Sequence, residues 1–313
     1  MLEEAPDPEL RPGEVLIRLR ASALNHLDVW IRKGLPSVPK PRILGADGAG
    51  VVEALGEGVS GFERGQPVVI NPGIEAGDGR VHVIGEHGDG TNAELIAVPA
   101  TNVYPLPDGL SFEDAAAFPL VFETAYRMLV TRAGLREGEW VLIWGIGGGV
   151  ATAALAIAKA LGARALVTSS SDAKLARARE LGADDTVNHA TGDVRTAVRE
   201  ATGGRGADVV VEHVGEATWR TSLDVAAVEG RIAVCGATSG SNPPAALHRI
   251  WWKQLAIFGS SMGTKADFEA VYDLVASGRV RPVVDEVLPL EEIRSAHARL
   301  EAGAQLGKIV LTI

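Results

Sequence analysis

The 313-residue sequence has one cysteine, few aromatic residues and fewer basic than acidic side chains. The single Cys235 excludes an internal disulfide and any zinc site built from several cysteines, and its apolar neighbours predict a buried structural thiol. The net charge of −10 argues against a surface for nucleic acid or anionic membranes. Since no apolar run is long enough to span a bilayer and the N-terminus has no basic or apolar leader, we expect a cytoplasmic protein.

Glycine, by contrast, is abundant, and four glycines stand close together in the segment WVLIWGIGGGVATAALAIAKALGA at 140–163. Its apolar start predicts a buried strand, and its alanine-rich second half predicts a helix. Between them the backbone can turn tightly at Gly145, Gly147, Gly148 and Gly149. The unpaired N–H groups and the dipole of a helix N-terminus favour an anion, so this segment predicts a pyrophosphate site of a dinucleotide. The spacing is one residue longer than the GxGxxG form, and a glycine turn without a ligand is the alternative.

The end of the next predicted strand, 164–168, indicates which dinucleotide binds. A site for NAD normally carries an acidic side chain here for the ribose 2′-hydroxyl, whereas this sequence has Ser169 and Ser170, with Lys174 one helical turn later. Hydroxyl and ammonium groups can donate to a 2′-phosphate, so we predict NADP(H). We interpret Asp172 as a helix N-cap. NAD(H) stays open, because the serines could be ordinary turn and cap residues.

The chain changes character after about one hundred residues. The first part predicts an all-β domain, with short strands at 15–20, 50–55, 67–70 and 93–98. Ser111 and Asp114 resemble a capping box for a helix through 117, and a second helix is expected at 122–132. Strands and helices then alternate up to a strand at 231–236, which predicts an α/β unit with a doubly wound parallel sheet. The remainder predicts a strand at 255–260, helices at 267–277 and 290–302, and a strand at 307–313.

Segments along nearly the whole chain resemble the medium-chain dehydrogenase/reductases, and specifically their zinc-free, quinone-oxidoreductase-like branch. They are RPGEVLIRLRASALNHLDVWIRKG, RILGADGAGVVEALGEGV, LSFEDAAAFPLVFETAYRML, the glycine turn, ADVVVEHVG and GKIVL. The resemblance implies a GroES-like substrate domain at 1–117 and 264–313. It also implies an inserted Rossmann domain at 118–263, with the cofactor between the two. Relative to that family, the sequence starts late in the first strand.

The resemblance also bears on metal binding. Where the alcohol dehydrogenases of the family have catalytic zinc ligands, this sequence has Asn25, Ala46 and Leu120. These residue types are not zinc ligands, so no catalytic zinc is expected. The cysteine-rich structural zinc lobe of relatives is also missing. We interpret its replacement, which contains His82, Glu86, His87 and Asp89, as a polar loop without metal.

Three neighbouring residues are the catalytic candidates. By family analogy, Asn25 lies near the nicotinamide and polarises or orients the substrate. His26 is a candidate proton source, although it could equally face solvent. Asp28 completes the set, and its expected task is to fix the geometry of the loop.

The predicted cofactor contacts extend beyond the glycine turn and the serine–lysine group. The resemblance implies that Thr124 helps to seat the nicotinamide, and that His189 lies where relatives have a tyrosine near the 2′-phosphate. His213 follows a strand and is expected to point toward the cofactor crevice, where it could pack or titrate. The other assigned contacts are Val150, Gly236 and Lys308.

The sequence therefore predicts an NAD(P)H-dependent oxidoreductase that reduces a quinone or an α,β-unsaturated carbonyl compound without zinc. The alternatives are an alcohol or aldehyde dehydrogenase of the same superfamily and a non-catalytic dinucleotide-binding protein. We expect a small-molecule substrate, no nucleic acid or membrane partner, and a homodimer formed through the strand at 255–260. Trp251 and Trp252 could line the substrate mouth or an interface.

Overall fold

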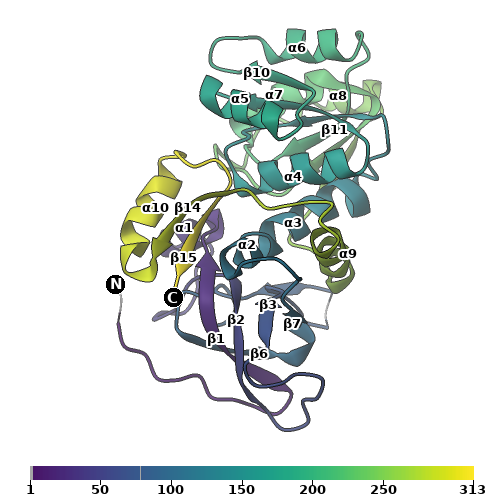
Figure 1. Ribbon diagram of the computed structural model, residues 1–313. Helices are drawn as coiled ribbons and strands as arrows, with labels where there is room; N and C mark the ends of the chain where they lie inside the picture. The colour runs from purple at the N-terminus through teal and green to yellow at the C-terminus, as the bar shows by residue number, and fades with distance from the viewer. Residues whose placement is uncertain (1–2, 78) are drawn as a thin grey trace. The chain divides into compact units, whose positions relative to one another are not determined.

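The computed structural model describes residues 3–77 and 79–313, and the chain forms two compact units. The first consists of the residues up to Leu120 together with Thr264–Ile313, and the second is Val121–Gly263. The chain thus leaves the first unit once and returns to it, as the colours of Figure 1 show. Among the described residues, none of the helices combines the length and the hydrophobicity that a membrane crossing requires.

The first unit is built on a seven-stranded sheet in which β6 pairs with β1, beside the path β14-β15-β1-β2-β3-β7. The last strand of the chain therefore lies next to the first one (Figure 1). The strands are β1 (Glu14–Ala23), β2 (Asp47–Leu55), β3 (Pro67–Ile70), β6 (Leu95–Pro99), β7 (Val103–Pro105), β14 (Val284–Pro289) and β15 (Lys308–Thr312). Alternate residues of β1, namely Val15, Ile17 and Leu19, are buried in the core as period-two patterning requires.

Several elements of this unit were not predicted. These elements are β7, β14 and the hairpin of β4 (Gly73–Glu75) and β5 (Val81–Val83). The expectation of an all-β first part was wrong, because α1 (His26–Arg32) follows β1 directly. This seven-residue helix is too short for a clear periodic pattern, and a capping box between Asn25 and Asp28 holds its start.

The other helices of the first unit follow the sequence closely. Ser111 caps α2 (Phe112–Ala116) by accepting a hydrogen bond from Asp114 N at 3.1 Å, which is one of the two bonds of the predicted capping box. The two helices of the C-terminal segment are present as α9 (Lys265–Ala276) and α10 (Ile293–Glu301), the latter after a 3-10 turn, η3 (Leu290–Glu292). A second 3-10 turn, η1 (Ala100–Asn102), links β6 to β7.

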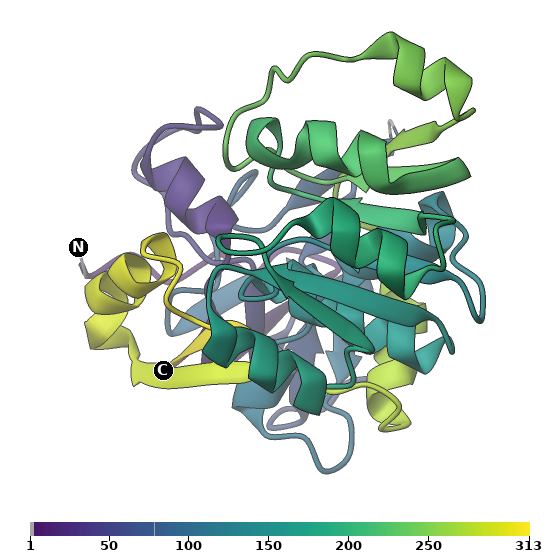
Figure 2. The same ribbon diagram turned by 90° about the horizontal axis from the view of Figure 1, so that it is seen from above.

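The second unit has a six-stranded parallel sheet in the order β10-β9-β8-β11-β12-β13, which confirms the predicted βα alternation. Helices cover both faces, and α6 and α7 lie side by side on one of them (Figure 2). The strands are β8 (Trp140–Ile143), β9 (Arg164–Ser169), β10 (Asp185–Asn188), β11 (Ala207–Glu212), β12 (Ala226–Val234) and β13 (Ala256–Gly259). The helices are α4 (Gly149–Ala160), α5 (Asp172–Glu180), α6 (Val194–Ala201), α7 (Glu216–Val225) and α8 (Leu247–Trp252). Successive strands run outward from β8 in one direction and from β11 in the other, so the order reverses between these two strands.

Three local predictions in this part of the chain need correction. Helix α7 ends at Val225 and not at 228, because β12 begins at the next residue, and the Lys253 ammonium donates to the carbonyl groups of Leu223, Asp224 and Ala226 at this end. The predicted helix at 122–132 is α3 (Pro119–Tyr126) followed by a π-helical turn, η2 (Arg127–Arg132).

The third correction concerns the start of α5. Its N-cap is Ser171, whose hydroxyl accepts from Lys174 N, and not Asp172. Asp172 is the first helical residue, and its carboxylate accepts a hydrogen bond from Asn188 Nδ2 at 2.7 Å. Ser171 therefore has a structural role as the cap of this helix.

Candidate active site

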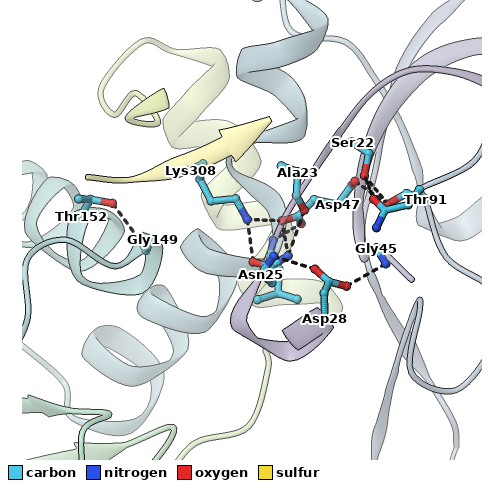
Figure 3. A network of polar contacts seen from close by, with 12 residues as sticks. Ser22, Ala23, Asn25, Asp28, Gly45, Asp47, Thr91, Gly149, Thr152 and Lys308 are labelled. Atoms are coloured by element: carbon cyan, nitrogen blue, oxygen red, sulfur yellow. Dashed lines mark hydrogen bonds and ion pairs between the residues drawn. The ribbon is translucent and has the colours of Figure 1, made fainter. Parts of the chain in front are cut away.

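Strand register in the first unit brings Asn25, Asp47 and Lys308 together. Ala23 pairs with Val310 of β15 on one side and with Asp47 of β2 on the other. Leu24 N donates to Ile309 O, so the antiparallel register continues and sets Asn25 opposite Lys308. Figure 3 shows the three side chains pointing toward one another.

The side chains of this Asn25–Asp47–Lys308 cluster form a closed set of short contacts. The Lys308 ammonium donates to Asn25 Oδ1 at 2.7 Å and to Asp47 Oδ2 at 2.8 Å, and Asn25 Nδ2 donates to Asp47 Oδ2 at 2.9 Å. Asp47 Oδ1 accepts from Leu120 N at 2.8 Å. Lys308 is 3% exposed as a side chain and Asp47 is fully buried. An ammonium group is tolerated at such a position when a carboxylate compensates its charge.

Asp47 is the member of this cluster that was not predicted from the sequence. The available signal was an aspartate inside the apolar, glycine-rich segment LGADGAGVV, since a charged side chain in a buried strand needs a partner. Its backbone is also held in place. Thr91 Oγ1 donates to Asp47 O at 2.7 Å and lies 3.1 Å from Ser22 Oγ (Figure 3).

The other two catalytic candidates lie at the start of α1. Asp28 accepts hydrogen bonds from Asn25 N at 2.7 Å and from Gly45 N at 2.8 Å, so its carboxylate ties the loop to the helix. Burial raises the pKa of Asp28 to about 6. His26 is exposed on the first turn of the helix. A catalytic role for His26 or Asp28 stays a prediction.

In the second unit, the glycine turn is fastened to the neighbouring strand ends. Gly145 has a φ of +61°, a left-handed conformation that favours glycine. Gly145 N donates to Thr168 Oγ1 at 3.1 Å, and His189 Nδ1 lies 3.2 Å from the same hydroxyl. Because the threonine hydroxyl accepts from the amide, its own proton can be donated to His189. These bonds join the carboxyl ends of β8, β9 and β10.

The N-terminus of α4 has the features of an anion cradle. Its N-cap is Gly148, so no side chain caps the first N–H groups of the helix. A Cβ at Gly148 would meet only Gly145 O, at 3.8 Å, which shows open space in front of the helix. Gly147, Gly149 and Val150 lie in the same turn, partly exposed. A cofactor pyrophosphate fits these residues, because it would satisfy the N–H groups and the helix dipole.

A cavity of about 320 Å³ lies beside this turn within the second unit. Its lining includes Trp144, Gly145, His189, Val214 and Thr218. Burial lowers the pKa of His189, which favours its neutral form. His213 Nε2 donates to Trp144 O at 2.8 Å, so the structure brings the two predicted histidines to the same strand ends as the glycine turn.

The remaining predicted cofactor contacts are distributed over both units. Ser169 is buried and its hydroxyl accepts from Ser171 N at 3.1 Å, whereas Ser170 is exposed and Lys174 is partly exposed. Gly236 borders His213 O. Thr124 is buried on α3, and Lys308 belongs to the cluster of the first unit. Their contacts with a cofactor stay predictions.

Comparisons with known proteins agree with this architecture. Residues 11–108 match the model described as alcohol dehydrogenase GroES-like domain, and residues 149–277 match zinc-binding dehydrogenase. A quinone oxidoreductase of Pseudomonas aeruginosa is 34% identical over 96% of this chain and 91% of its own length. A crotonyl-CoA reductase of Streptomyces avermitilis is 32% identical over 98% and 80%, respectively. A crystal structure named as an NAD-dependent alcohol dehydrogenase has a TM-score of 0.95 and 45% identity, covering 99% of this chain and 95% of that one.

The chain belongs to the medium-chain dehydrogenase/reductase superfamily. It is an oxidoreductase with a GroES-like unit and a Rossmann-like dinucleotide-binding unit, as the sequence predicts. Which of the superfamily's reactions it catalyses depends on the side chains at its active site.

Zinc is named in one of the matching superfamily models, but the donor atoms in this chain do not fit it. Ala46 directly precedes Asp47 in the sequence, and Leu120 N donates a hydrogen bond to the Asp47 carboxylate. Neither an alanine nor a leucine side chain can bind a metal. The Asp47 carboxylate and Asn25 Oδ1 already bind the Lys308 ammonium. Outside positions 1, 2 and 78, no three His, Cys, Asp or Glu side chains gather as metal ligands. That the enzyme works without zinc stays a prediction.

Proposed function

We propose that this protein is an NADPH-preferring reductase of quinones or α,β-unsaturated carbonyl compounds that uses no catalytic metal. The observation that carries the proposal is the buried Asn25–Asp47–Lys308 cluster, in which a protein ammonium group occupies the donor atoms that a metal would need. An electron-poor conjugated acceptor suits such a site, because it needs less Lewis-acid activation than a simple alcohol or aldehyde does.

The relatives' names support the same class of acceptor. One is a quinone oxidoreductase and another is a crotonyl-CoA reductase. When bound, the nicotinamide cofactor would supply a hydride. The chain's own contribution is then to bind the pyrophosphate at the N-terminus of α4 and to present a hydrogen-bond donor to the oxygen that becomes negative.

The preference for NADPH rests on the residues after β9. Ser170 is exposed, Lys174 follows one helical turn later, and the strand ends without a carboxylate. The exposed Asp172 carboxylate is directed to Asn188. The related structure named NAD-dependent makes NADH the specific alternative.

The test is an oxidation screen with NADPH and NADH against quinones, enones, aldehydes and alcohols, with metal content measured on the same preparation. We expect turnover with quinones or enones, a preference for NADPH of about tenfold or more, corresponding to about 1.4 kcal/mol, and substoichiometric zinc. A preference for NADH of the same size would overturn the cofactor assignment.

Two other outcomes would select the alternatives. Stoichiometric zinc with rapid alcohol oxidation would make the protein an alcohol dehydrogenase, the activity named for the 45% identical structure. Tight NADPH binding with no acceptor consumed above background would indicate a non-catalytic dinucleotide-binding protein.

A further inference from the structure

Within the Asn25–Asp47–Lys308 cluster, one N–H donor of the Lys308 ammonium group makes no hydrogen bond. An ammonium group has three N–H donors, and Lys308 uses two of them, toward Asn25 Oδ1 and Asp47 Oδ2. The Asn25 amide is committed inside the cluster, because Nδ2 donates to Asp47 at 2.9 Å and contacts Ala23 O at 3.4 Å. Among the described residues, the third N–H of Lys308 has no protein acceptor.

We propose that this third N–H donates to the carbonyl oxygen of the hydride acceptor, which makes Lys308 the electrophilic catalyst of the reaction. The inference rests on the proposed reduction of quinones or enones. It assigns to Lys308 the polarising role that the sequence suggested for Asn25, and it replaces the predicted contact of Lys308 with the cofactor.

Tetrahedral geometry fixes the direction of this donor. The bond to Cε and the two hydrogen bonds of 2.7 and 2.8 Å define three of the four directions around Nζ. With these three directions occupied, the third N–H of Lys308 can point only in the fourth direction. A buried, pre-oriented ammonium stabilises developing negative charge without reorganising, which is the requirement for an oxyanion donor. The Asp47 carboxylate, 2.8 Å away and fully buried, compensates the charge of this ammonium group inside the protein.

The acceptor, NADPH and one proton from water account for all electrons and protons of the reaction. The acceptor gains one hydride, that is, two electrons together with one proton, at a quinone carbonyl or at the β-carbon of an enone. The electron pair displaced from the carbonyl π system collects on the oxygen, where Lys308 Nζ–H stabilises it. NADPH is oxidised to NADP⁺, and one proton from water gives the neutral product, so Lys308 ends each cycle still protonated.

The test compares two acceptors of different intrinsic reactivity in Lys308→Met and Lys308→Arg. A weakly electrophilic enone needs help at its oxygen, whereas a strongly oxidising quinone needs little. We expect Lys308→Met to lower kcat on the enone by about 10²–10³-fold, the range for loss of one oxyanion donor. The quinone rate should fall by less than about tenfold. Lys308→Arg, which keeps a charged donor, should recover part of the enone rate.

A second measurement separates this role from cofactor binding. The Kd of NADPH, followed by quenching of tryptophan fluorescence, should stay within about twofold of the wild-type value in Lys308→Met. A large rise in Kd would overturn the proposal and return Lys308 to the cofactor contacts. An equal loss of kcat on both acceptors would also overturn it, because a structural defect does not distinguish them.

Lys308→Met leaves the Asp47 carboxylate buried without its counter-ion, so a second variant without either charge is included in the test. Asp47→Asn combined with Lys308→Met removes both charges, and the same split between enone and quinone is expected in this double variant. An unchanged ratio of the two rates would contradict the proposal. Failure of the proposed function is distinguishable, since the wild-type protein would then reduce neither acceptor.

Discussion

At the scale of single residues, two buried titratable side chains in the first unit have opposing effects on stability. Burial, with a smaller effect of the Arg32 charge, lowers the pKa of His297 from 6.5 to about 4. Its Nδ1 has no hydrogen-bond partner among the described residues. Burial acts in the other direction on a carboxylic acid, and it raises the pKa of Asp28 from 3.8 to about 6 despite two backbone donors.

The signs follow from which state binds the additional proton. Between about pH 4 and 6.5 the unfolded chain protonates at His297 while the folded chain does not, so this residue makes stability rise with pH. Between pH 3.8 and about 6 the folded chain retains a proton on Asp28 that the unfolded chain loses, so this residue makes stability fall with pH. Each effect amounts to about 3 kcal/mol across its window, and the two largely cancel between pH 4 and 6.

Substituting one of the two residues should therefore reveal the pH dependence of stability that the other one causes. Relative to the wild-type protein, His297→Leu should lose stability as the pH rises from 4 to 6, by about 3 kcal/mol. Relative to the wild-type protein, Asp28→Asn should gain a similar amount of stability as the pH rises over that range. The loss of one hydrogen bond from a backbone amide lowers the stability of this variant equally at every pH and does not affect the slope. Urea unfolding at four or five pH values measures both. A His297→Leu profile parallel to that of the wild-type protein would contradict the assignment.

At the scale of an element, the glycine turn between β8 and α4 combines two different demands on the backbone. Gly145 is required by its positive φ, because a side chain in the left-handed region is strained. Gly148 has φ −80° and ψ 151°, which any residue adopts, and a Cβ there meets no protein atom closer than 3.8 Å. The fold therefore does not require a glycine at 148, whereas the proposed pyrophosphate site does.

This difference predicts a split between two matched variants. Gly145→Ala should destabilise the second unit by about 1–2 kcal/mol. Gly148→Ala should leave the melting temperature within about 1 °C of wild type but weaken NADPH binding at least about tenfold, because its methyl group enters the space in front of the helix. Thermal unfolding and cofactor titration measure the two effects. Unchanged NADPH affinity in Gly148→Ala would exclude the proposed pyrophosphate cradle.

At the scale of the whole molecule, exposed apolar residues gather on elements near one edge of the six-stranded sheet. Strand β13 is the last strand on that edge, and Ile257 on it is 38% exposed. On the preceding helix α8, Trp251 and Trp252 are 63% and 74% exposed, with their rings in an edge-to-face arrangement. An open strand edge beside large apolar side chains is suited to a second copy of the chain, and we propose a homodimer formed there.

If the homodimer forms through this edge, substitutions there should lower the molecular mass of the protein in solution. Trp252→Glu and Ile257→Lys should each shift the protein from twice the mass of one chain to a single chain, because a charge at the centre of an apolar interface stays unpaired. Light scattering after gel filtration measures the mass. Leu35→Glu is the matched control, since Leu35 is 66% exposed in the first unit and should leave the dimer intact. A wild-type protein with the mass of one chain would refute the proposal.

Much of the fold could be predicted because its signals are local. In the second unit, runs such as Trp140–Ile143 and the helix at Gly149–Ala160 carry their period and their glycine boundaries within a dozen residues. The first unit was predicted less well. Its three-residue strands Gly73–Glu75, Val81–Val83 and Val103–Pro105 are too short to show alternation, and only pairing with a neighbour makes them strands.

The candidate site divides in the same way. The sequence by itself determined the glycine turn, the serine end of β9 and the lack of zinc-binding side chains at positions 25, 46 and 120, because each depends on residue type and short spacing. Only the tertiary structure decided which side chains gather where zinc ligands are missing. Asn25 and Lys308 are 283 residues apart, and the register of β15 on β1 sets them opposite each other, with Asp47 supplied by β2. The Asp47–Lys308 ion pair joins residues 261 positions apart and leaves no local sequence pattern, since its partners meet only when β1 pairs with both β2 and β15.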